Sequence, residues 1–164
     1  MNNLKLVKFN NPILRSVSER YKFNQSLDMA EFSQELIKFL YDNNGLNVTG
    51  PQIGMPYRII ALKGHPENFV MFNPIIVDLS EQEVILDETS LTYPGISIKI
   101  KRPLSCRVRF TTPNQDVRTE KFNGITARVF QQSMDFLDGK LFYSTANPIH
   151  KEQALRKWRR LKNH

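Results

Sequence analysis

The sequence predicts a domain of the α+β class. Three observations support this prediction: a helical segment comes first, a series of short β-type segments follows it, and two further helical segments end the chain. The length of 164 residues suits one domain, and no repeat, low-complexity stretch or linker divides it. We therefore expect all of these elements to share one fold.

The first helix is predicted within residues 26–45. Ser26 is placed to cap its N-terminus, acidic residues occupy its first turn, and Asn44–Gly45 is placed to end it. Because apolar residues recur at helical spacing, we expect one face of this helix to be buried. These residues are Met29, Phe32, Leu36 and Leu40.

Five segments rich in β-branched and aromatic residues predict strands, with Gly, Pro, Asn and Asp between them. One of them, residues 97–110, alternates apolar and basic residues, as a pair of strands half facing water does. Pro103 marks a break or a sheet edge inside it. The five segments are residues 57–64, 68–80, 82–93, 97–110 and 116–124.

A second helix is predicted over residues 125–139. One stripe of it carries Ile125, Val129 and Phe136, and an adjoining face is apolar as well. A helix that is apolar on most sides belongs in the interior of a protein. The adjoining face holds Ala127, Phe130, Met134 and Leu137.

The final helical pattern, residues 148–164, is strongly basic. Its last fifteen residues hold six Lys or Arg and one Glu, which leaves only +2 of the net charge of +7 for the rest of the chain. A basic segment beside a nearly neutral body predicts a contact with an acidic partner. We therefore divide the chain into a body, residues 1–147, and a basic tail, residues 148–164.

Composition and cysteine usage suggest where the chain resides. Cys106 is the single cysteine, so it forms no internal disulfide, which fits a reducing compartment. The N-terminus lacks an apolar run of signal-peptide length, and no stretch approaches the length of a membrane span. We expect a cytoplasmic protein, or a component of a virus particle assembled in the cytoplasm.

Three stretches, in order, resemble the motifs of the peptide deformylase family. "GLNVTGPQIG", "ETSLT" and "QQSMDFLDG" are similar to that family's G-x-G-L-A-A-x-Q-I-G, E-G-C-L-S and Q-H-E-x-D-H-L-x-G. The resemblance covers almost the whole chain. It implies the deformylase α+β fold, with a central helix packed among antiparallel sheets and, in this chain, a basic C-terminal helix.

The resemblance also implies a metal site, and this chain departs from it. In the family, a cysteine and two histidines hold a divalent iron, zinc or nickel ion, and a glutamate serves as general acid and base. The ligand positions here are Ser90, Gln132 and Phe136, and the glutamate position is Ser133. A hydroxyl and an amide are poor ligands for such ions, and a phenyl ring is no ligand. We therefore expect no metal and no other cofactor.

Other positions match the family better than the chemical ones do. Gln52 and Leu91 match residues that stabilise the developing oxyanion. A further set matches residues that buttress the site, and for it we expect a structural role. This set is Glu88, Arg102, Arg128 and Asp135.

From these substitutions we predict a catalytically inactive deformylase-like protein that serves as a binding or structural module. Its partners would be the proteins of a virus particle or the ribosome. The alternative is a residual deformylase, or another hydrolase that removes formyl from the N-terminal formyl-methionine of nascent peptides.

The tail allows two interpretations. In the first, basic side chains meet RNA phosphates or a protein surface while Trp158 anchors the contact. In the second, the tail is a solvated helix whose strip of Leu155, Trp158 and Leu161 packs on the body. The basic residues of the first interpretation are Arg156, Lys157, Arg159 and Arg160.

Overall fold

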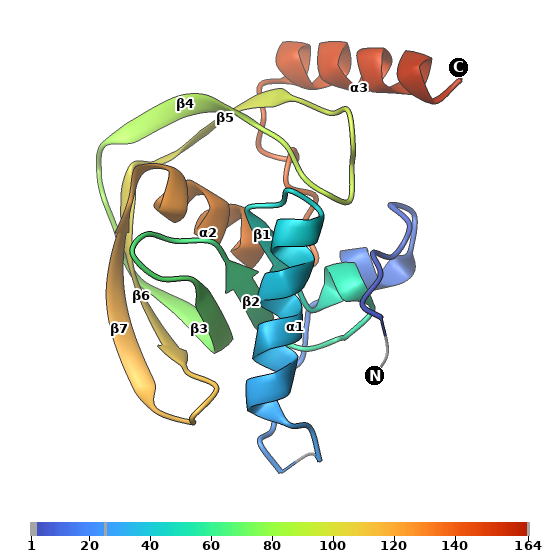
Figure 1. The fold of residues 1–164 in the computed structure, drawn as a ribbon. Helices are drawn as coiled ribbons and strands as arrows, with labels where there is room; N and C mark the ends of the chain where they lie inside the picture. The colour runs from blue at the N-terminus through green and yellow to red at the C-terminus, as the bar shows by residue number, and fades with distance from the viewer. Residues whose placement is uncertain (1–2, 25, 164) are drawn as a thin grey trace.

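Two antiparallel β-sheets and three α-helices form the computed structural model, which describes residues 3–24 and 26–163 (Figure 1). The larger sheet has five strands in the order β1-β2-β3-β6-β7, and the smaller sheet pairs β4 with β5. The predicted α+β class is confirmed. The strands are β1 (Asn47–Thr49), β2 (Ile59–Leu62), β3 (Phe69–Leu79), β4 (Glu83–Glu88), β5 (Ile98–Pro103), β6 (Ser105–Thr111) and β7 (Val117–Asn123).

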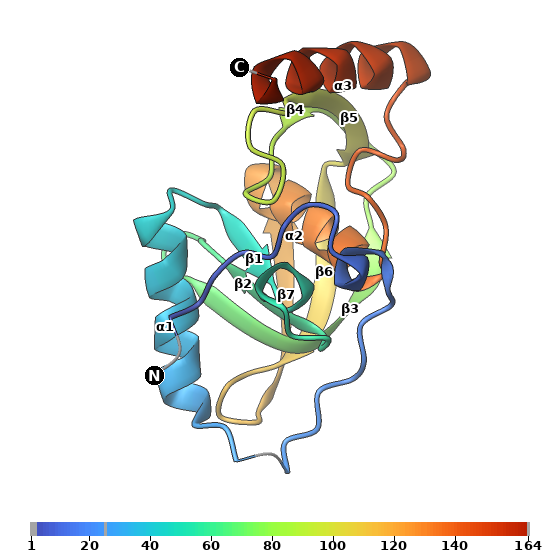
Figure 2. The same ribbon diagram turned by 90° about the vertical axis from the view of Figure 1, so that its right-hand side faces the viewer.

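Helix α2 occupies the middle of the molecule, as Figures 1 and 2 show, with the large sheet curving around it and β4–β5 at its other side. Helix α1 lies at the side of the large sheet, and α3 lies beyond β4–β5. The expected central helix among antiparallel sheets is thus confirmed. The helices are α1 (Met29–Asp42), α2 (Gly124–Leu137) and α3 (Pro148–Lys162), with short 3-10 turns at Pro12–Arg15 (η1) and Pro51–Ile53 (η2).

Strand β2 explains why two helices pack on the large sheet. Its side chains alternate between the two faces, because successive residues of a strand point in opposite directions. Ile60 and Leu62 join a core cluster with the apolar face of α2. Ile59 and Ala61 join a second cluster with α1. The sheet therefore separates two cores, one on each face.

A third core cluster connects β5, the C-terminal half of α2 and α3. Ile98 and Ile100 of β5 contribute to it, together with Phe136 of α2 and Trp158 of α3. Trp158 is only 8% exposed, so α3 packs on the body. The tail is thus a helix, as predicted, and its apolar side is partly covered, although Leu161 remains 57% exposed.

Several local predictions need correction. The side chain of Asp28, rather than that of Ser26, caps α1 by accepting a hydrogen bond from the Glu31 N–H at 3.0 Å. The predicted strand over residues 82–93 ends at Glu88, and a loop follows it. Ile125 is 55% exposed rather than buried with its stripe, because it lies in the first turn of α2.

The segment 97–110 does form two strands, with the break at the expected place. However, β5 and β6 do not pair with each other: β5 pairs with β4, while β6 pairs with β3 and β7. Among the described residues, no helix is sufficiently long and apolar to cross a membrane.

Candidate functional site

The three motif segments meet at a pocket of about 290 Å³. The pocket lies between the segment that leads from α1 into β1, the loop that follows β4, and one face of α2. Asn47 reaches it from the first motif, Ser90 and Leu91 from the second, and Gln132 from the third. Gln52, Ser133 and Phe136 are buried behind its wall and do not line it.

Asn47 and Gln132 form the floor of the pocket, and both belong to a hydrogen-bonded cluster with the buried hydroxyl of Ser133. The Asn47 side-chain amide donates to Ser133 Oγ at 2.7 Å and to Gln132 Oε1 at 3.1 Å. Gln132 Nε2 in turn donates to the Thr89 carbonyl at 2.9 Å. Asn47, Gln132 and Ser133 are all nearly inaccessible to solvent. The oxygens of Gln132 and Ser133 therefore already have protein partners.

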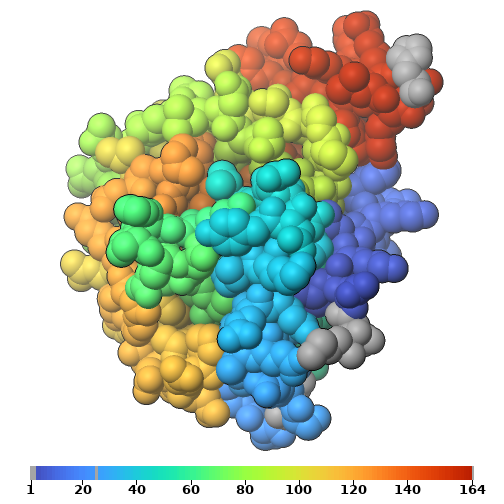
Figure 3. Space-filling view, viewed as in Figure 1, coloured from blue at the N-terminus to red at the C-terminus, as the bar shows by residue number. Residues whose placement is uncertain are grey.

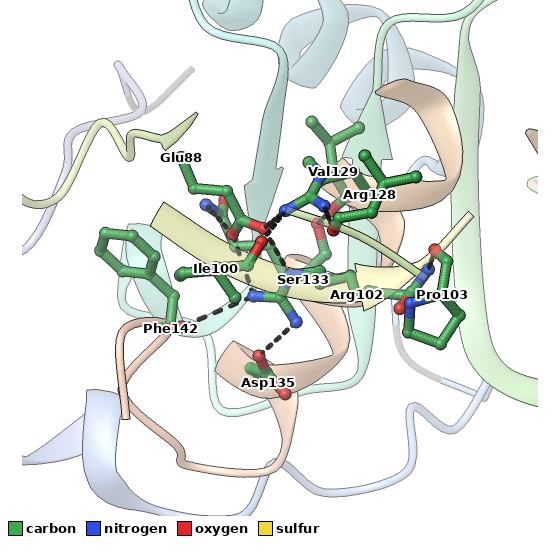
Figure 4. A network of polar contacts seen from close by, with 12 residues as sticks. Glu88, Ile100, Arg102, Pro103, Arg128, Val129, Ser133, Asp135 and Phe142 are labelled. Atoms are coloured by element: carbon green, nitrogen blue, oxygen red, sulfur yellow. Dashed lines mark hydrogen bonds and ion pairs between the residues drawn. The ribbon is translucent and has the colours of Figure 1, made fainter. Parts of the chain in front are cut away.

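A buried ion-pair network adjoins this cluster (Figure 4), and two of its members, Glu88 and Arg128, also line the pocket. Glu88 accepts two hydrogen bonds from Arg102, at 2.5 and 2.9 Å, and a third from Arg128 at 2.6 Å. Arg102 also donates to Asp135 at 2.9 Å. Burying these charges is tolerated only because each is paired and hydrogen-bonded. The structural role expected of the four residues stays a prediction.

Burial and neighbouring charges shift the pKa of two members of this network, Arg102 and Asp135. Burial opposes the charge of Arg102, but its bonds to Glu88 and Asp135 outweigh burial, so the pKa of its guanidinium is raised. Burial also raises the pKa of the Asp135 carboxyl, and the neighbouring Arg102 opposes that rise. The network thus fixes β4, β5 and α2 to one another.

Gln52 connects the first motif to the second. Its Oε1 accepts from the Thr49 N–H at 3.0 Å, and its Nε2 donates to Thr92 Oγ1 at 2.9 Å. This arrangement holds the loop after β4 against η2. The predicted role of Gln52 at an oxyanion remains a prediction, because its side chain does not line the pocket. Leu91 does line the pocket, and its N–H donates no hydrogen bond among the described residues.

The residues at the family's metal positions do not fit a divalent iron, zinc or nickel ion. Ser90 offers a hydroxyl, which accepts from the Thr92 N–H at 3.3 Å. Gln132 offers an amide whose oxygen is engaged by Asn47. Phe136 is 1% exposed and stacks on Phe142, with ring centroids 6.5 Å apart. This donor set lacks the thiolate and imidazoles that such ions prefer.

Among the described residues, no three His, Cys, Asp or Glu side chains come together in a way that could hold a metal ion. We therefore derive no chemical step through a metal.

Two contributors to the site were not predicted. Phe142 fills the space beside Phe136 and its carbonyl lies 3.5 Å from Arg102 Nη2, although it belongs to none of the motifs. Pro94, on the pocket wall, accepts a hydrogen bond from the Trp158 indole at 2.8 Å. Neither contact has a local sequence signal, because each joins residues far apart in the chain.

The four basic residues expected to contact a partner lie on helix α3. Arg156, Lys157, Arg159 and Arg160 are exposed. Trp158 points into the body, so it is not available as an exposed anchor. A contact between the tail and an acidic partner remains a prediction.

Comparison with known proteins identifies the family to which the chain belongs. The family model of polypeptide deformylase matches residues 3–152. The chain is 30% identical over 146 residues to a chloroplastic peptide deformylase 1B of rice, covering 85% of this chain and 54% of that one. It is 28% identical over 172 residues to a peptide deformylase of Wolbachia pipientis, covering 93% and 96%. A plant peptide deformylase structure superposes with a TM-score of 0.89 at 23% identity, over 99% of this chain and 91% of that one.

These matches overturn our prediction of a catalytically inactive structural module. The relatives are named as peptide deformylases, which are enzymes, and no positive observation indicates a pseudoenzyme, a virion component, or a protein bound to RNA or the ribosome. The prediction relied on four side chains, Ser90, Gln132, Ser133 and Phe136. Replacing side chains in one site alters its chemistry but does not by itself establish a new role for the whole fold. The classification as a non-enzyme is therefore wrong, and the chain belongs to the polypeptide deformylase family.

Proposed function

We propose that this chain removes the formyl group from the N-terminal formyl-methionine of peptides. The observation that carries the proposal is the pocket, which the family's three motif segments build together in a chain that matches the family over residues 3–152. The relatives' name gives the substrate class, an N-formylated peptide. Because formylated N-termini arise during protein synthesis, we place the activity in the cytoplasm.

The pocket wall supports binding of a methionine side chain and a small polar head. Leu46, Leu91 and Val129 supply apolar surface, which suits the flexible thioether of methionine. The N–H of Leu91 is oriented by the loop that Gln52 holds and can donate to the formyl oxygen. The amide of Gln132 adds a polar group at the floor.

We assign binding and orientation to these residues, and no step to a metal. The donor set at Ser90, Gln132 and Phe136 does not fit the family's ion, so turnover has to be measured under defined metal conditions. The substrate probe is formyl-Met-Ala-Ser, and the two products to quantify are formate and the free α-amino group. Reactions are run with a chelator and, separately, with added iron(II), nickel(II) or zinc(II).

Enzyme-dependent release of formate in any of these conditions supports the proposal. No release above the uncatalysed rate in all of them, with a protein shown to be folded, overturns it.

Two exposed isoleucines provide a matched pair of variants. Ile125 and Ile149 are each the second residue of a helix, and they are 55% and 67% exposed. Only Ile125 lines the pocket. Glutamate is favourable in the first turn of a helix, so neither Ile125→Glu nor Ile149→Glu should unfold the chain.

If the peptide binds in the pocket, covering part of the Ile125 side chain contributes about 1 kcal/mol. Ile125→Glu should then lower kcat/KM about fivefold or more. Ile149→Glu should leave kcat/KM unchanged. Equal effects of the two variants would place the substrate elsewhere.

A further inference from the structure

The helix α3, which lies outside the family's motifs, contacts one wall of the pocket. The wall in question is the segment 89–97, here called the rim, which connects β4 to β5. It contributes Thr89, Ser90, Leu91, Pro94 and Gly95 to the lining.

The contact between α3 and the rim is direct. The Trp158 indole N–H donates to the Pro94 carbonyl at 2.8 Å, and the ring itself is 8% exposed. Gly95 has a φ of +90°, and a Cβ added to it would lie 3.6 Å from Trp158 and 3.4 Å from Leu161. The space-filling view shows α3 lying against this part of the molecule (Figure 3). The positive φ is what favours glycine at position 95, because an added Cβ would only make ordinary van der Waals contact with α3.

Aromatic packing extends the contact to α2. Trp158 packs against Tyr93 of the rim, with ring centroids 6.1 Å apart, and Tyr93 packs against Phe142 at 5.7 Å. Phe142 stacks on Phe136 of α2. The rim is therefore held between two helices by one continuous set of rings. Phe136, at a ligand position of the family's metal site, is the inner end of this set.

Few other bonds hold the rim. Among the described residues, side chains from outside it donate to the rim at three points: Gln132 to Thr89, Gln52 to Thr92, and Trp158 to Pro94. The first two bonds lie at the inner part of the loop. The bond from Trp158 is the one made to Pro94, between Tyr93 and Ile96, whose side chains are buried in the third core cluster.

We propose that Trp158 is a positioning residue. Its indole keeps Pro94 and Gly95 in the position that peptide binding requires. Helix α3 is then a part of the peptide-binding site. That a peptide binds in the pocket depends on the function proposed above, whereas the contact between Trp158 and the rim does not. The test therefore has one arm without substrate and one arm with it.

The variant is Trp158→Phe, which keeps an aromatic ring and removes the indole N–H. The matched control is Phe122→Leu, which alters another buried ring, one that packs in the α2 core on Phe69 and Phe130, away from the rim. Both are characterised by melting temperature, so that general loss of stability is measured separately.

In the first arm, amide hydrogen exchange is followed by mass spectrometry. Trp158→Phe should speed exchange in peptides covering residues 89–97 about fivefold, the factor expected for loss of one net hydrogen bond. Peptides covering β1 and β2 should be unchanged. Unchanged exchange in the rim, or equal acceleration in Phe122→Leu, overturns the proposal.

In the second arm, steady-state kinetics with formyl-Met-Ala-Ser separate binding from turnover. Trp158→Phe should raise KM about fivefold while kcat changes less than twofold, and Phe122→Leu should leave KM unchanged. A KM that does not move in Trp158→Phe overturns the role in substrate binding. If the parent protein shows no turnover, the proposed function fails, and hydrogen exchange alone decides whether Trp158 holds the rim.

Discussion

Replacing Phe136 by histidine restores a residue of the family's metal site, and we expect it to destabilise this protein. Phe136 is 1% exposed and lies in the third core cluster, stacked on Phe142. An imidazole at this place would be smaller than the phenyl ring and would bring two ring nitrogens into an apolar environment. Both changes act against the folded state.

The expected magnitude follows from burial. A fully buried phenylalanine contributes about 1.5–3 kcal/mol, part of which an imidazole loses, and an unpaired buried polar group costs about 1–3 kcal/mol. Phe136→His should therefore lower the free energy of unfolding by about 2–4 kcal/mol. For a chain of this length, that corresponds to a fall in melting temperature of roughly 4–16 °C.

The effect should also depend on pH. Burial disfavours the charged imidazole and lowers its pKa in the folded state below the unfolded value of about 6.5. Below that pH the unfolded chain binds a proton that the folded chain does not, so the free energy of unfolding falls further as pH decreases. Phe136→His should lose up to about 1.4 kcal/mol more per pH unit below 6.

Urea unfolding of the parent, Phe136→His and Phe136→Leu at pH 7.5 and pH 5.5 checks this. Leucine keeps the site apolar and should cost only about 1 kcal/mol at both pH values. The reasoning is refuted if Phe136→His is as stable as Phe136→Leu at both.

Three further predictions concern charge, the buried thiol and metal content. Glu88→Gln should lower the free energy of unfolding by about 3–5 kcal/mol in urea titrations, because it leaves two buried arginines underpaired; a loss below about 1 kcal/mol would contradict this. Burial raises the pKa of the Cys106 thiol from an ordinary 9.0 to about 12. The native protein should therefore not react with a thiol reagent at pH 8, whereas the unfolded chain should bind one equivalent of the reagent. Above pH 9 the unfolded thiol ionises while the folded one stays neutral, so the free energy of unfolding should fall with rising pH, and Cys106→Ala should flatten that fall. Elemental analysis should find no stoichiometric iron, zinc or nickel, because Ser90, Gln132 and Phe136 make a poor donor set; about one ion per chain, lost in Gln132→Ala, would disprove this.

Elements with a strong periodic pattern could be predicted from the sequence. Helix α2 was expected over residues 125–139 and is found at Gly124–Leu137. Strand β1 has only three residues, all buried, and was not predicted, because so short a segment carries no periodicity. The loop after Glu88 was predicted as strand because "TSLTY" contains β-branched and aromatic residues, although part of this loop lines the pocket.

Only those residues of the candidate site that belong to the family's motifs could be predicted from the sequence. The motif positions Ser90 and Gln132 line one pocket, and Glu88 pairs with Arg102. The motifs give no sign of the bond from Asn47 to Ser133, which joins residues 86 positions apart. Such contacts depend on how distant elements pack, and one sequence does not encode them in any local pattern.

The prediction of a non-enzyme was wrong for a related reason. It rested on the ligand chemistry of a few positions, whereas the match to the polypeptide deformylase family extends over residues 3–152.

The place of Trp158 has a spectroscopic consequence. It is the single tryptophan in the chain, so the intrinsic fluorescence on excitation at long ultraviolet wavelength comes from one indole, at the junction of α3 and the rim. An indole released from that junction enters water, and its emission shifts to the red. The protein therefore carries its own reporter: in a denaturant titration, an emission shift that precedes the loss of circular dichroism would show α3 separating before the two sheets unfold.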